Sequence, residues 1–383
     1  MENGILKNTK KEKVKKFFSK TWKYILSFIV SIVIITLIFI YQVDFNLLKT
    51  TFNEANILFI LLAALFYIIG LVIGAIKLQY LLYINGFKIN FFKTLLYHTY
   101  GMLFSSFTPA KSGYTLIAYP LKVNDFPVTK TFSIFFIGQL YDFALRIPVT
   151  IIGIIFLFID TNSTNYVWLG VIGLSILVVL SLGSYVFASG KLFNIEKIFS
   201  KRLKKIGNFI RKYKEQFKKI SLKQSIFLTI ITSLGWIAFA FKWYFISFSI
   251  NYRISFIDSA FLLPLIFVIS FLPISLAGLG FVESGIIFLY IIRYPSLDRD
   301  LVVSIGLTFM IIERIINLVT TVPGLLTYIE LPRIKKLKEK ERDVLESKTE
   351  KVESVEPLEE KPVENKITVS IDTNEEVIDH NEE

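Results

Sequence analysis

The hydrophobic positions of this chain gather into long blocks that are separated by polar connections. Two examples are YILSFIVSIVIITLIFIY at 24–41 and WLGVIGLSILVVLSLGSYVF at 168–187, and neither block contains a charged residue. About 20 consecutive apolar residues in helical form cross the hydrocarbon core of a membrane. The pattern therefore predicts an all-α, polytopic membrane protein with about six spanning helices, near 24–41, 57–80, 131–159, 166–188, 224–250 and 302–327.

Two further apolar regions, 92–120 and 257–293, do not read as simple spans. The second contains FLPISLAGLGFVESG at 271–285, in which a proline, glycines and a glutamate interrupt the apolar run. Proline removes a backbone donor and glycine relaxes the backbone, so together they break a helix. Broken backbone inside a membrane must face protein or a water-filled cavity. We therefore expect two re-entrant helical hairpins.

The basic segments predict how the chain is oriented. The N-terminal segment 1–23 and the connection 190–223 are rich in Lys and Arg, which places them in the cytoplasm, whereas 160–164 has no basic residue and is expected outside. With these assignments 92–120 enters and leaves from the cytoplasmic side and 257–293 from the outer side. Both termini are then cytoplasmic, and the predicted location is the plasma membrane.

This order of elements divides the membrane part into two repeats, 24–159 and 160–330, that face opposite ways. Each repeat has two spans, a hairpin and a last span, which is the inverted-repeat arrangement of many transporters. Short motifs recur in the same order. They are AIKLQY (75–80), SSFTPAKSG (105–113) and QLYD (139–142) in the first repeat, and AFKWYF (240–245), ISFLPISLAG (269–278) and RIIN (314–317) in the second.

Composition narrows the possible chemistry. The chain has 383 residues, 53% of them hydrophobic, a net charge of +12, two histidines and no cysteine. Disulfides, thiolate metal sites and cysteine nucleophiles are excluded, and we expect no metal and no cofactor. Residues 341–383 contain 15 of the 31 acidic residues. We interpret the whole segment 331–383 as a cytoplasmic disordered tail that is first basic and then acidic. The basic connections fit anionic lipid headgroups, and we expect no nucleic-acid partner.

Several residues at the two breaks are candidates for binding a substrate headgroup. Glu283 follows the second break where a helix should restart, so it either caps that helix or contacts a proton or headgroup. Lys111 lies in the first break and either contacts a lipid phosphate or extends to the cytoplasmic interface. The remaining candidates at the breaks are Pro109, Gly113, Pro273, Gly278 and Gly280.

Charged residues inside the spans need partners, because an unpaired charge in a membrane is costly. Asp142 and Arg146 are four apart on one helix face and can pair. Arg314 shares a face with Asn317 and can pair with Glu283 or Glu313. Each of these pairs is either part of the site or structural cross-linking between helices. Lys242 lies deep within its span and is also a candidate.

At these motifs the chain resembles the lysylphosphatidylglycerol-synthase-type transmembrane, or flippase-like, family. LPISLAGLGFVES at 272–284 is similar to the family element L-P-x-x-x-G-G-L-G-x-x-E, and ERIIN at 313–317 resembles E-R-x-x-D. The first repeat departs from the family pattern: Tyr114 stands where the family has an acid, and Gly138 and Gln139 replace an E-R pair. The resemblance implies the flippase half of that system without the aminoacyl-transferase domain.

The leading hypothesis is a flippase-like transporter that moves an anionic phospholipid or a polyprenyl-phosphate-linked glycolipid between leaflets. Its partners would be membrane lipids, with lipid-linked sugars or a cell-envelope biosynthesis enzyme as further candidates. One alternative is a membrane-embedded lipid or glycosyl transferase that uses Glu283, Glu313 or Asp142 as a base. The other is a non-transporting membrane scaffold whose tail recruits partners.

Overall fold

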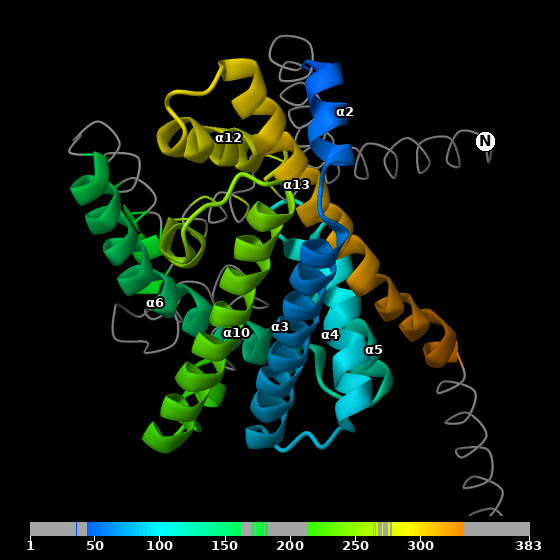
Figure 1. The fold of residues 1–383 in the computed structure, drawn as a ribbon. Coiled ribbons are helices and arrows are strands. Elements are labelled where there is room, and N and C mark those ends of the chain that lie inside the picture. The colour runs from blue at the N-terminus through cyan, green and yellow to red at the C-terminus, as the bar shows by residue number, and fades with distance from the viewer. Residues whose placement is uncertain are drawn as a thin grey trace, which may run out of the picture. The chain divides into compact units, whose positions relative to one another are not determined.

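The structure is a computed structural model in which residues 44–161, 213–262 and 278–332 are described, with isolated positions at 36, 171–182, 211 and 264–275 (Figure 1). Every regular element of these residues is helical, as the sequence predicts. The elements are α2 (Phe45–Asn53), α3 (Ile57–Ile84), α4 (Phe91–Ser105), η1 (Ser112–Ile117), α5 (Ala118–Val123), α6 (Val128–Thr161), α10 (Leu222–Ser249), η2 (Asp258–Leu262), α12 (Phe281–Arg293), α13 (Arg299–Thr321) and η4 (Val322–Leu325).

Four helices in the described part of the chain are long and apolar enough to cross a membrane. They are α3, α6, α10 and the continuous helical segment from α13 to Pro332. At 1.5 Å per residue the 28 residues of α3 or α10 extend about 42 Å, more than the ~30 Å of a hydrocarbon core. These helices confirm four of the predicted spans. The other two, 24–41 and 166–188, lie outside the described residues apart from single positions.

Two short helices occupy the regions that did not fit as spans. α4 has 15 residues and α12 has 13, which corresponds to about 22 Å and 20 Å of helix. Neither can cross the hydrocarbon core alone. The chain leaves α4 through a turn at 106–111, and α12 begins directly after the glycines at 278 and 280. Both predicted helix breaks are therefore present, and the side of the membrane from which each is entered stays a prediction.

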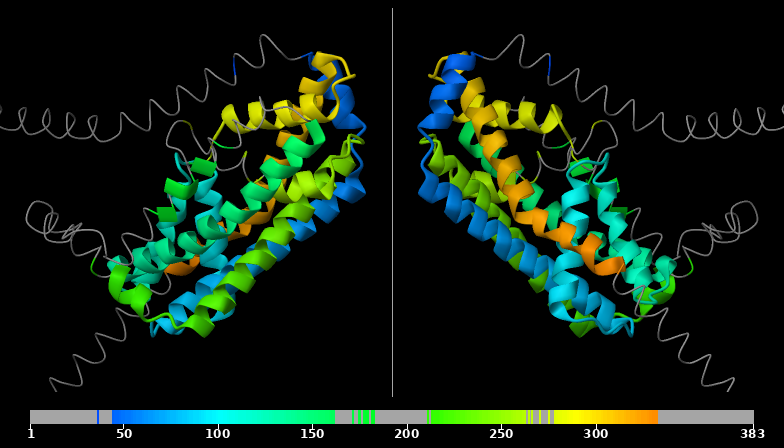
Figure 2. Two further views of the ribbon diagram at one scale, coloured as in Figure 1. Left: turned by 90° about the vertical axis from the view of Figure 1, so that its left-hand side faces the viewer. Right: turned by 90° about the vertical axis from the view of Figure 1, so that its right-hand side faces the viewer.

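α3 and α10 form an antiparallel pair along most of their length (Figures 1 and 2). At one end the amide of Asn56 donates to the carbonyl of Ser249 at 2.7 Å. At the other end the rings of Tyr80 and Phe227 lie 4.5 Å apart between centroids. Phe66 and Phe241 stack between these ends at 4.9 Å, so aromatic contacts hold the pair in register.

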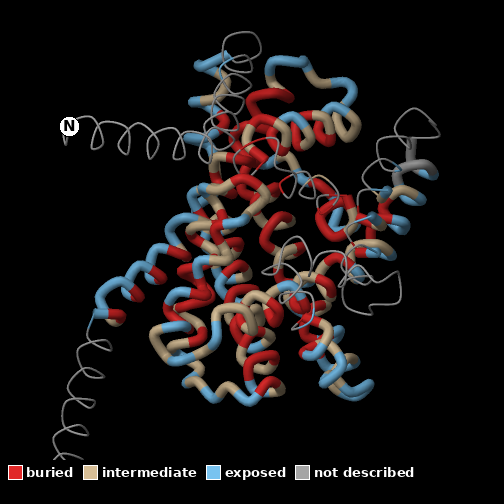
Figure 3. The backbone as a smooth tube through the Cα atoms, turned by 180° about the vertical axis from the view of Figure 1, so that it is seen from behind, coloured by how far each residue is buried: buried red, intermediate tan, exposed pale blue. Residues whose placement is uncertain are grey.

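The buried apolar side chains divide into two main clusters, and α3 contributes to both. One cluster joins the first half of α3 to α10, α12 and α13, and includes Tyr67 and Phe309. The other joins the second half of α3 to α4, α5 and α6, and includes Leu81 and Ile137. Figure 3 shows buried positions running through the middle of the helices while exposed positions follow their outer faces and ends. The middle of α3 lies between the two clusters, and its polar residue Lys77 lies near this boundary.

The last span of each predicted repeat packs against the interrupted region of the other repeat. A Cβ added at Gly153 of α6 would lie 2.7 Å from the carbonyl oxygen of Phe261 in η2. A Cβ added at Gly324 of η4, at the end of α13, would lie 2.3 Å from the amide of Tyr100 in α4. A glycine therefore allows close backbone contact at both places. The same kind of contact occurs twice with the two halves exchanged.

Candidate functional site

The first helix break is a tight turn that holds Lys111 in a strained conformation. Ala110 and Lys111 have φ values of 54° and 52°, in the left-handed region that L-residues other than Gly, Asn and Asp seldom adopt. Such a conformation costs about 1–2 kcal/mol per residue. The turn is stabilised by the amide of Gly113, which donates to Thr108 Oγ1 at 2.6 Å. Strain kept at one polar position makes Lys111 a functional candidate.

Gly113 and Pro109 let the chain fold back on the end of α4. A Cβ at Gly113 would lie 2.2 Å from the carbonyl oxygen of Phe104, so only glycine fits there. Pro109 is buried, and its carbonyl accepts the amide of Ser112 at 3.0 Å. Both residues shape the turn, and neither carries a group that faces the cavity described below.

The second break ends where α12 begins, and Glu283 caps this helix. Gly278 and Gly280 have φ values of 82° and 85°, which glycine adopts without strain. Glu283 Oε2 accepts the amide of Gly280 at 2.7 Å, which satisfies one of the free donors at the start of the helix. The predicted restart of the helix at Glu283 is confirmed. Pro273 lies outside the described residues.

Glu283 also binds Arg314 of α13, and it is one of the two carboxylates that the sequence predicts as partners of Arg314. Its Oε1 accepts from Nε of Arg314 at 2.9 Å and from Nη2 at 2.5 Å. The Glu283 side chain is 8% exposed, whereas Arg314 keeps 32% of its side chain exposed. The carboxylate thus fixes the guanidinium from one side and leaves part of it accessible.

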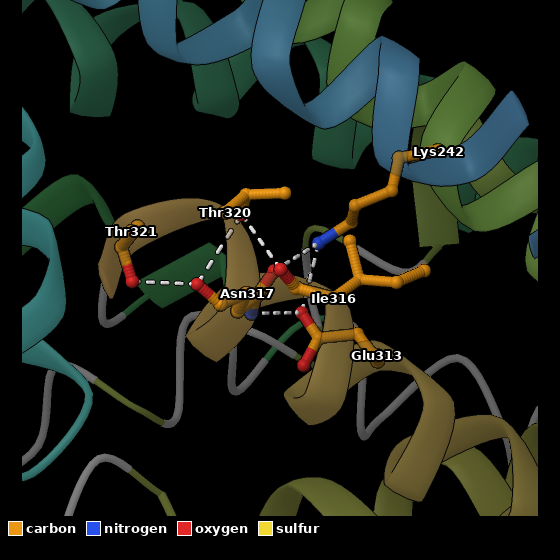
Figure 4. A network of polar contacts seen from close by, with 6 residues as sticks. All are labelled: Lys242, Glu313, Ile316, Asn317, Thr320 and Thr321. Atoms are coloured by element: carbon orange, nitrogen blue, oxygen red, sulfur yellow. Dashed lines mark hydrogen bonds and ion pairs between the residues drawn. The ribbon is translucent and has the colours of Figure 1, made fainter. Parts of the chain in front are cut away.

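Lys242 and Glu313 form a buried ion pair between α10 and α13 (Figure 4). Lys242 Nζ donates to Glu313 Oε1 at 2.8 Å and to Asn317 Oδ1 at 3.2 Å, and Asn317 Nδ2 donates to the same carboxylate oxygen at 2.7 Å. The Lys242 ammonium also lies 4.7 Å from the ring centroid of Tyr67 and 5.0 Å from that of Trp243. Aromatic faces and a carboxylate together compensate for burying the charge.

A second lysine bridge joins α3 to α6. Lys77 Nζ donates to Asp142 Oδ1 at 2.6 Å. The sequence predicts that Arg146, four residues further along α6, can pair with Asp142; the structure adds Lys77 as a partner, and the charge of Asp142 also acts on Arg146. Lys77 is 65 positions away in sequence, so helix periodicity could not identify it. In the predicted repeat Lys77 matches Lys242, and Asp142 matches Asn317, which also accepts a hydrogen bond from Lys242, so a lysine joins the matching pair of helices in each half.

The two bridges lie at different depths along the α3–α10 pair. Tyr67 marks the level of Lys242, because their side chains are in contact. Lys77 is ten residues further along α3, which is about 15 Å at 1.5 Å per residue. The structure therefore contains two charged layers, one toward each end of the antiparallel pair.

A cavity of about 580 Å³ extends between these layers and is lined by both halves of the chain. Its described lining residues include five cations and two carboxylates, so the formal surplus is three positive charges, or two if Glu283 behind Arg314 is included. The cations are Lys77, Lys111, Arg146, Lys242 and Arg314, and the carboxylates are Asp142 and Glu313. Asn317 lines the cavity as well, which confirms that it shares a face with Arg314. A cavity with this charge attracts an anion.

Lys111 connects the two halves electrostatically. Among the charged residues whose fields act on it, Arg146 of α6 is the strongest, and Glu313, Lys242 and Arg314 of the second half also contribute. The cation from the first break therefore lies within the field of the charged groups on α6, α10 and α13.

Neutral polar residues line the rest of the cavity in the first half. His98 Nδ1 lies 2.6 Å from the hydroxyl of Tyr114, and both side chains reach the cavity. Gln139, which matches Arg314 in the repeat, lines it too. The sequence patterns assign no site role to Lys77, His98 or Gln139, although the lysine motif that recurs at 75–80 and 240–245 was a usable signal for Lys77. In the part of the chain that the structure describes, no three His, Asp or Glu side chains gather in a metal-binding arrangement.

Comparison with known proteins agrees with this architecture. The sequence profile of the family described as the lysylphosphatidylglycerol synthase TM region matches residues 24–324. A comparison with curated proteins found no match. The matched region covers most of the chain, including the described helices up to residue 324, so the protein belongs to this family. It is accordingly a multi-pass membrane protein of a family linked by its description to membrane lipids.

Proposed function

We propose that this member of the lysylphosphatidylglycerol synthase TM-region family moves an anionic lipid from one leaflet of its membrane to the other. The observation that carries the proposal is the cavity between the two halves, whose described lining has three more cations than carboxylates. A lipid headgroup that crosses a membrane needs compensation for its charge throughout the passage. Cations along the cavity supply this compensation, while the acyl chains stay in the surrounding lipid.

Arg314 and Lys111 are the proposed phosphate contacts, one from each half. Arg314 presents a planar fork of donors that matches phosphate oxygens, and part of it is accessible beside Glu283. Lys111 reaches the cavity from a strained turn, and Arg146 lies within its field. A phosphate between these groups would contact both halves at once. Its binding would therefore depend on how the halves are arranged.

The repeated architecture supports a transport cycle rather than a fixed pore. Each half has a lysine bridge, and each last span packs against the interrupted region of the other half. Two halves related in this way can exchange roles by rocking around a site near the middle of the membrane. We therefore propose that the two repeats are inverted and that the two breaks are re-entrant.

The contacts of the carboxylates favour transport over the transferase alternative. Asp142, Glu313 and Glu283 each accept a hydrogen bond from a Lys or Arg side chain, at 2.6, 2.8 and 2.5 Å. A general base must be able to reach a substrate proton at hydrogen-bond distance. Carboxylates engaged by cations are better suited to positioning those cations.

Transfer of a labelled lipid between leaflets tests the proposal. The full chain is reconstituted in phosphatidylcholine vesicles with a trace of phosphatidylglycerol that carries a fluorescent acyl chain, and a membrane-impermeant reductant bleaches the dye in the outer leaflet. We expect the protein to expose the inner-leaflet dye to bleaching, and Lys111→Met to slow this at least tenfold.

Lys93→Met is the matched control, because Lys93 pairs with Glu330 at 3.3 Å and does not line the cavity. It removes one positive charge from the same membrane domain and should transport at the wild-type rate. Equal rates for empty vesicles and protein-containing vesicles would contradict lipid transport. Equal effects of both substitutions would contradict the assignment of Lys111 to the site.

A further inference from the structure

The cavity contains a neutral polar patch that the charged contacts do not use. Gln139 lies on α6 one turn before Asp142 and is partly exposed to the cavity. Its amide group makes no hydrogen bond to any other described residue. An uncharged amide offers two N–H donors and a carbonyl acceptor. Gln139 is thus available to a bound molecule at a position where the second half has Arg314.

Thr232 of α10 supplies a second group of the same kind. The residue is 7% exposed and lines the cavity. Its hydroxyl has no hydrogen-bond partner among the described residues, although most buried hydroxyls in proteins have one. A buried hydroxyl without a hydrogen-bond partner destabilises the protein. A ligand hydroxyl that bonds to Thr232 would remove this penalty.

The helix register brings these two groups to one level of the cavity. Tyr67 contacts Lys242, and α3 and α10 are antiparallel, so Thr232, ten residues before Lys242, lies opposite the stretch of α3 around Lys77. Lys77 binds Asp142, and Gln139 is one turn from Asp142 on the same face of α6. Gln139 and Thr232 therefore both line the cavity near the level of the first lysine bridge.

We propose that Gln139 and Thr232 form a subsite for hydroxyl groups, so that the preferred headgroup is a phosphate ester bearing hydroxyls, as in polyol-phosphate or sugar-phosphate lipids. This inference rests on the proposed function for the phosphate contacts. The phosphate lies near the cavity cations Lys111, Arg146 and Arg314, and the uncharged part of the headgroup extends toward Gln139 and Thr232. Because the patch is neutral, it distinguishes headgroups by their hydroxyls and leaves the choice of charge to Lys111, Arg146 and Arg314.

Two soluble probes of equal charge separate this subsite from the phosphate site. Glycerol 1-phosphate and n-propyl phosphate share the phosphate and the three-carbon chain and differ only in hydroxyls. Trp236 and Trp243 line the cavity, so tryptophan fluorescence of the detergent-solubilised full chain reports binding. We expect glycerol 1-phosphate to bind about threefold to tenfold more tightly, as one or two neutral hydrogen bonds predict.

Variants that keep the shape of the side chains test the two residues. Gln139→Met and Thr232→Val should each bring the ratio of the two affinities toward one while leaving n-propyl phosphate binding unchanged. The thermal unfolding midpoint should not fall, since neither side chain loses a hydrogen bond to a described residue. Equal binding of both probes by the wild type, or loss of both probes in the variants, would overturn the subsite.

Vesicle experiments separate failure of the subsite from failure of the proposed function. Phosphatidylglycerol and phosphatidylpropanol, labelled on the acyl chain, carry the same two headgroups into the bilayer. If both lipids cross at equal rates that Lys111→Met abolishes, the transport function stands and the subsite is wrong. If neither lipid crosses while glycerol 1-phosphate still binds selectively, the subsite stands as a site for a soluble phosphate ester and lipid transport is wrong.

Discussion

Arg314 has two roles that its contacts make possible at the same time. Glu283 accepts two of its N–H groups on one oxygen, which fixes the plane of the guanidinium. About a third of the side chain remains exposed, and it lines the cavity. A phosphate that enters can therefore bind the free edge without first breaking the ion pair. Glu283 is itself fixed because it caps α12 through Gly280.

This arrangement predicts that stability and transport can be separated at Arg314. Arg314→Ala removes the cation that pairs with the buried carboxylate of Glu283. We expect the free energy of unfolding to fall by about 2 kcal/mol, which is less than the ~3–5 kcal/mol for breaking a fully buried pair, because Arg314 is partly exposed. Adding Glu283→Gln removes the unpaired charge and should recover most of that loss. Transport of labelled phosphatidylglycerol should stay at least tenfold below wild type in both variants. Recovery of transport in the double variant would show that Arg314 serves only as structural support.

The strained turn at Lys111 gives a second prediction at this scale. Ala110→Gly and Lys111→Gly relieve left-handed strain at neighbouring positions with φ values of 54° and 52°, and only the second removes a charge. Each should change the free energy of unfolding by at most about 1 kcal/mol, since the relief of strain is offset by the greater freedom of glycine in the unfolded chain. Phosphatidylglycerol transport should be kept by Ala110→Gly and lost by Lys111→Gly. Equal transport by the two variants would mean that the turn, and not the ammonium group, matters.

Local features of the site were predictable from sequence, and long-range partners were not. The restart of a helix at Glu283 follows from the glycines that precede it, because glycine and helix capping act over a few residues. The partner of Asp142 depends on how α3 packs against α6. Helix periodicity indicates Arg146, and only the packing shows that Lys77, 65 positions away, also donates to the Asp142 carboxylate. Thr232 gave no signal, because a threonine in an apolar helix resembles many others until its neighbours are known.

At the scale of helices, the two lysine bridges tie equivalent pairs of elements, α3 to α6 and α10 to α13. They differ in burial: the side chains of Lys242 and Glu313 are 2% and 4% exposed, and those of Lys77 and Asp142 are 14% and 27% exposed. Burial raises the cost of leaving one charge without its partner. The second bridge is thus the more rigid connection.

We predict that removing the more buried lysine, Lys242, lowers the free energy of unfolding more than removing Lys77. Lys242→Met should lower the free energy of unfolding by about 3–5 kcal/mol, because Glu313 is then left buried without its cation. Lys77→Met should cost on the order of 1–2 kcal/mol, because Asp142 remains partly accessible. Denaturant unfolding of the full chain in detergent measures both. The double variant Lys242→Met with Glu313→Gln should recover much of the loss, and a larger cost at Lys77 than at Lys242 would contradict the order.

Hydropathy predicted the elements better than their packing. The four described spans begin and end within a few residues of their predicted limits, since apolar length alone decides whether a helix can cross a membrane. The breaks at 106–111 and before α12 followed from proline and glycine. The aromatic register of α3 against α10 could not be predicted, because the chain contains 37 Phe and 18 Tyr, and most of them would suit lipid equally well.

At the scale of the whole molecule, two contacts occur once in each predicted repeat. The lysine bridges lie about 15 Å apart along α3. The last span of each half packs closely against the other half at a glycine, Gly153 or Gly324. An arrangement of this kind gives a membrane transporter two equivalent states if the halves face opposite ways. The orientation of the chain therefore decides whether the repeat is an inverted one.

Because the chain has no cysteine, its orientation can be measured with single cysteines and no background. The distribution of Lys and Arg predicts that the connection around Ser163 is outside and the basic connection around Ser200 is cytoplasmic. In intact cells a membrane-impermeant maleimide should label Ser163→Cys and not Ser200→Cys, and permeabilised cells should label both. Both substitutions lie in polar connections, so transport should persist and report that the labelled protein is folded. Labelling of both positions from the same side would leave an even number of crossings between them and would rule out the inverted repeat.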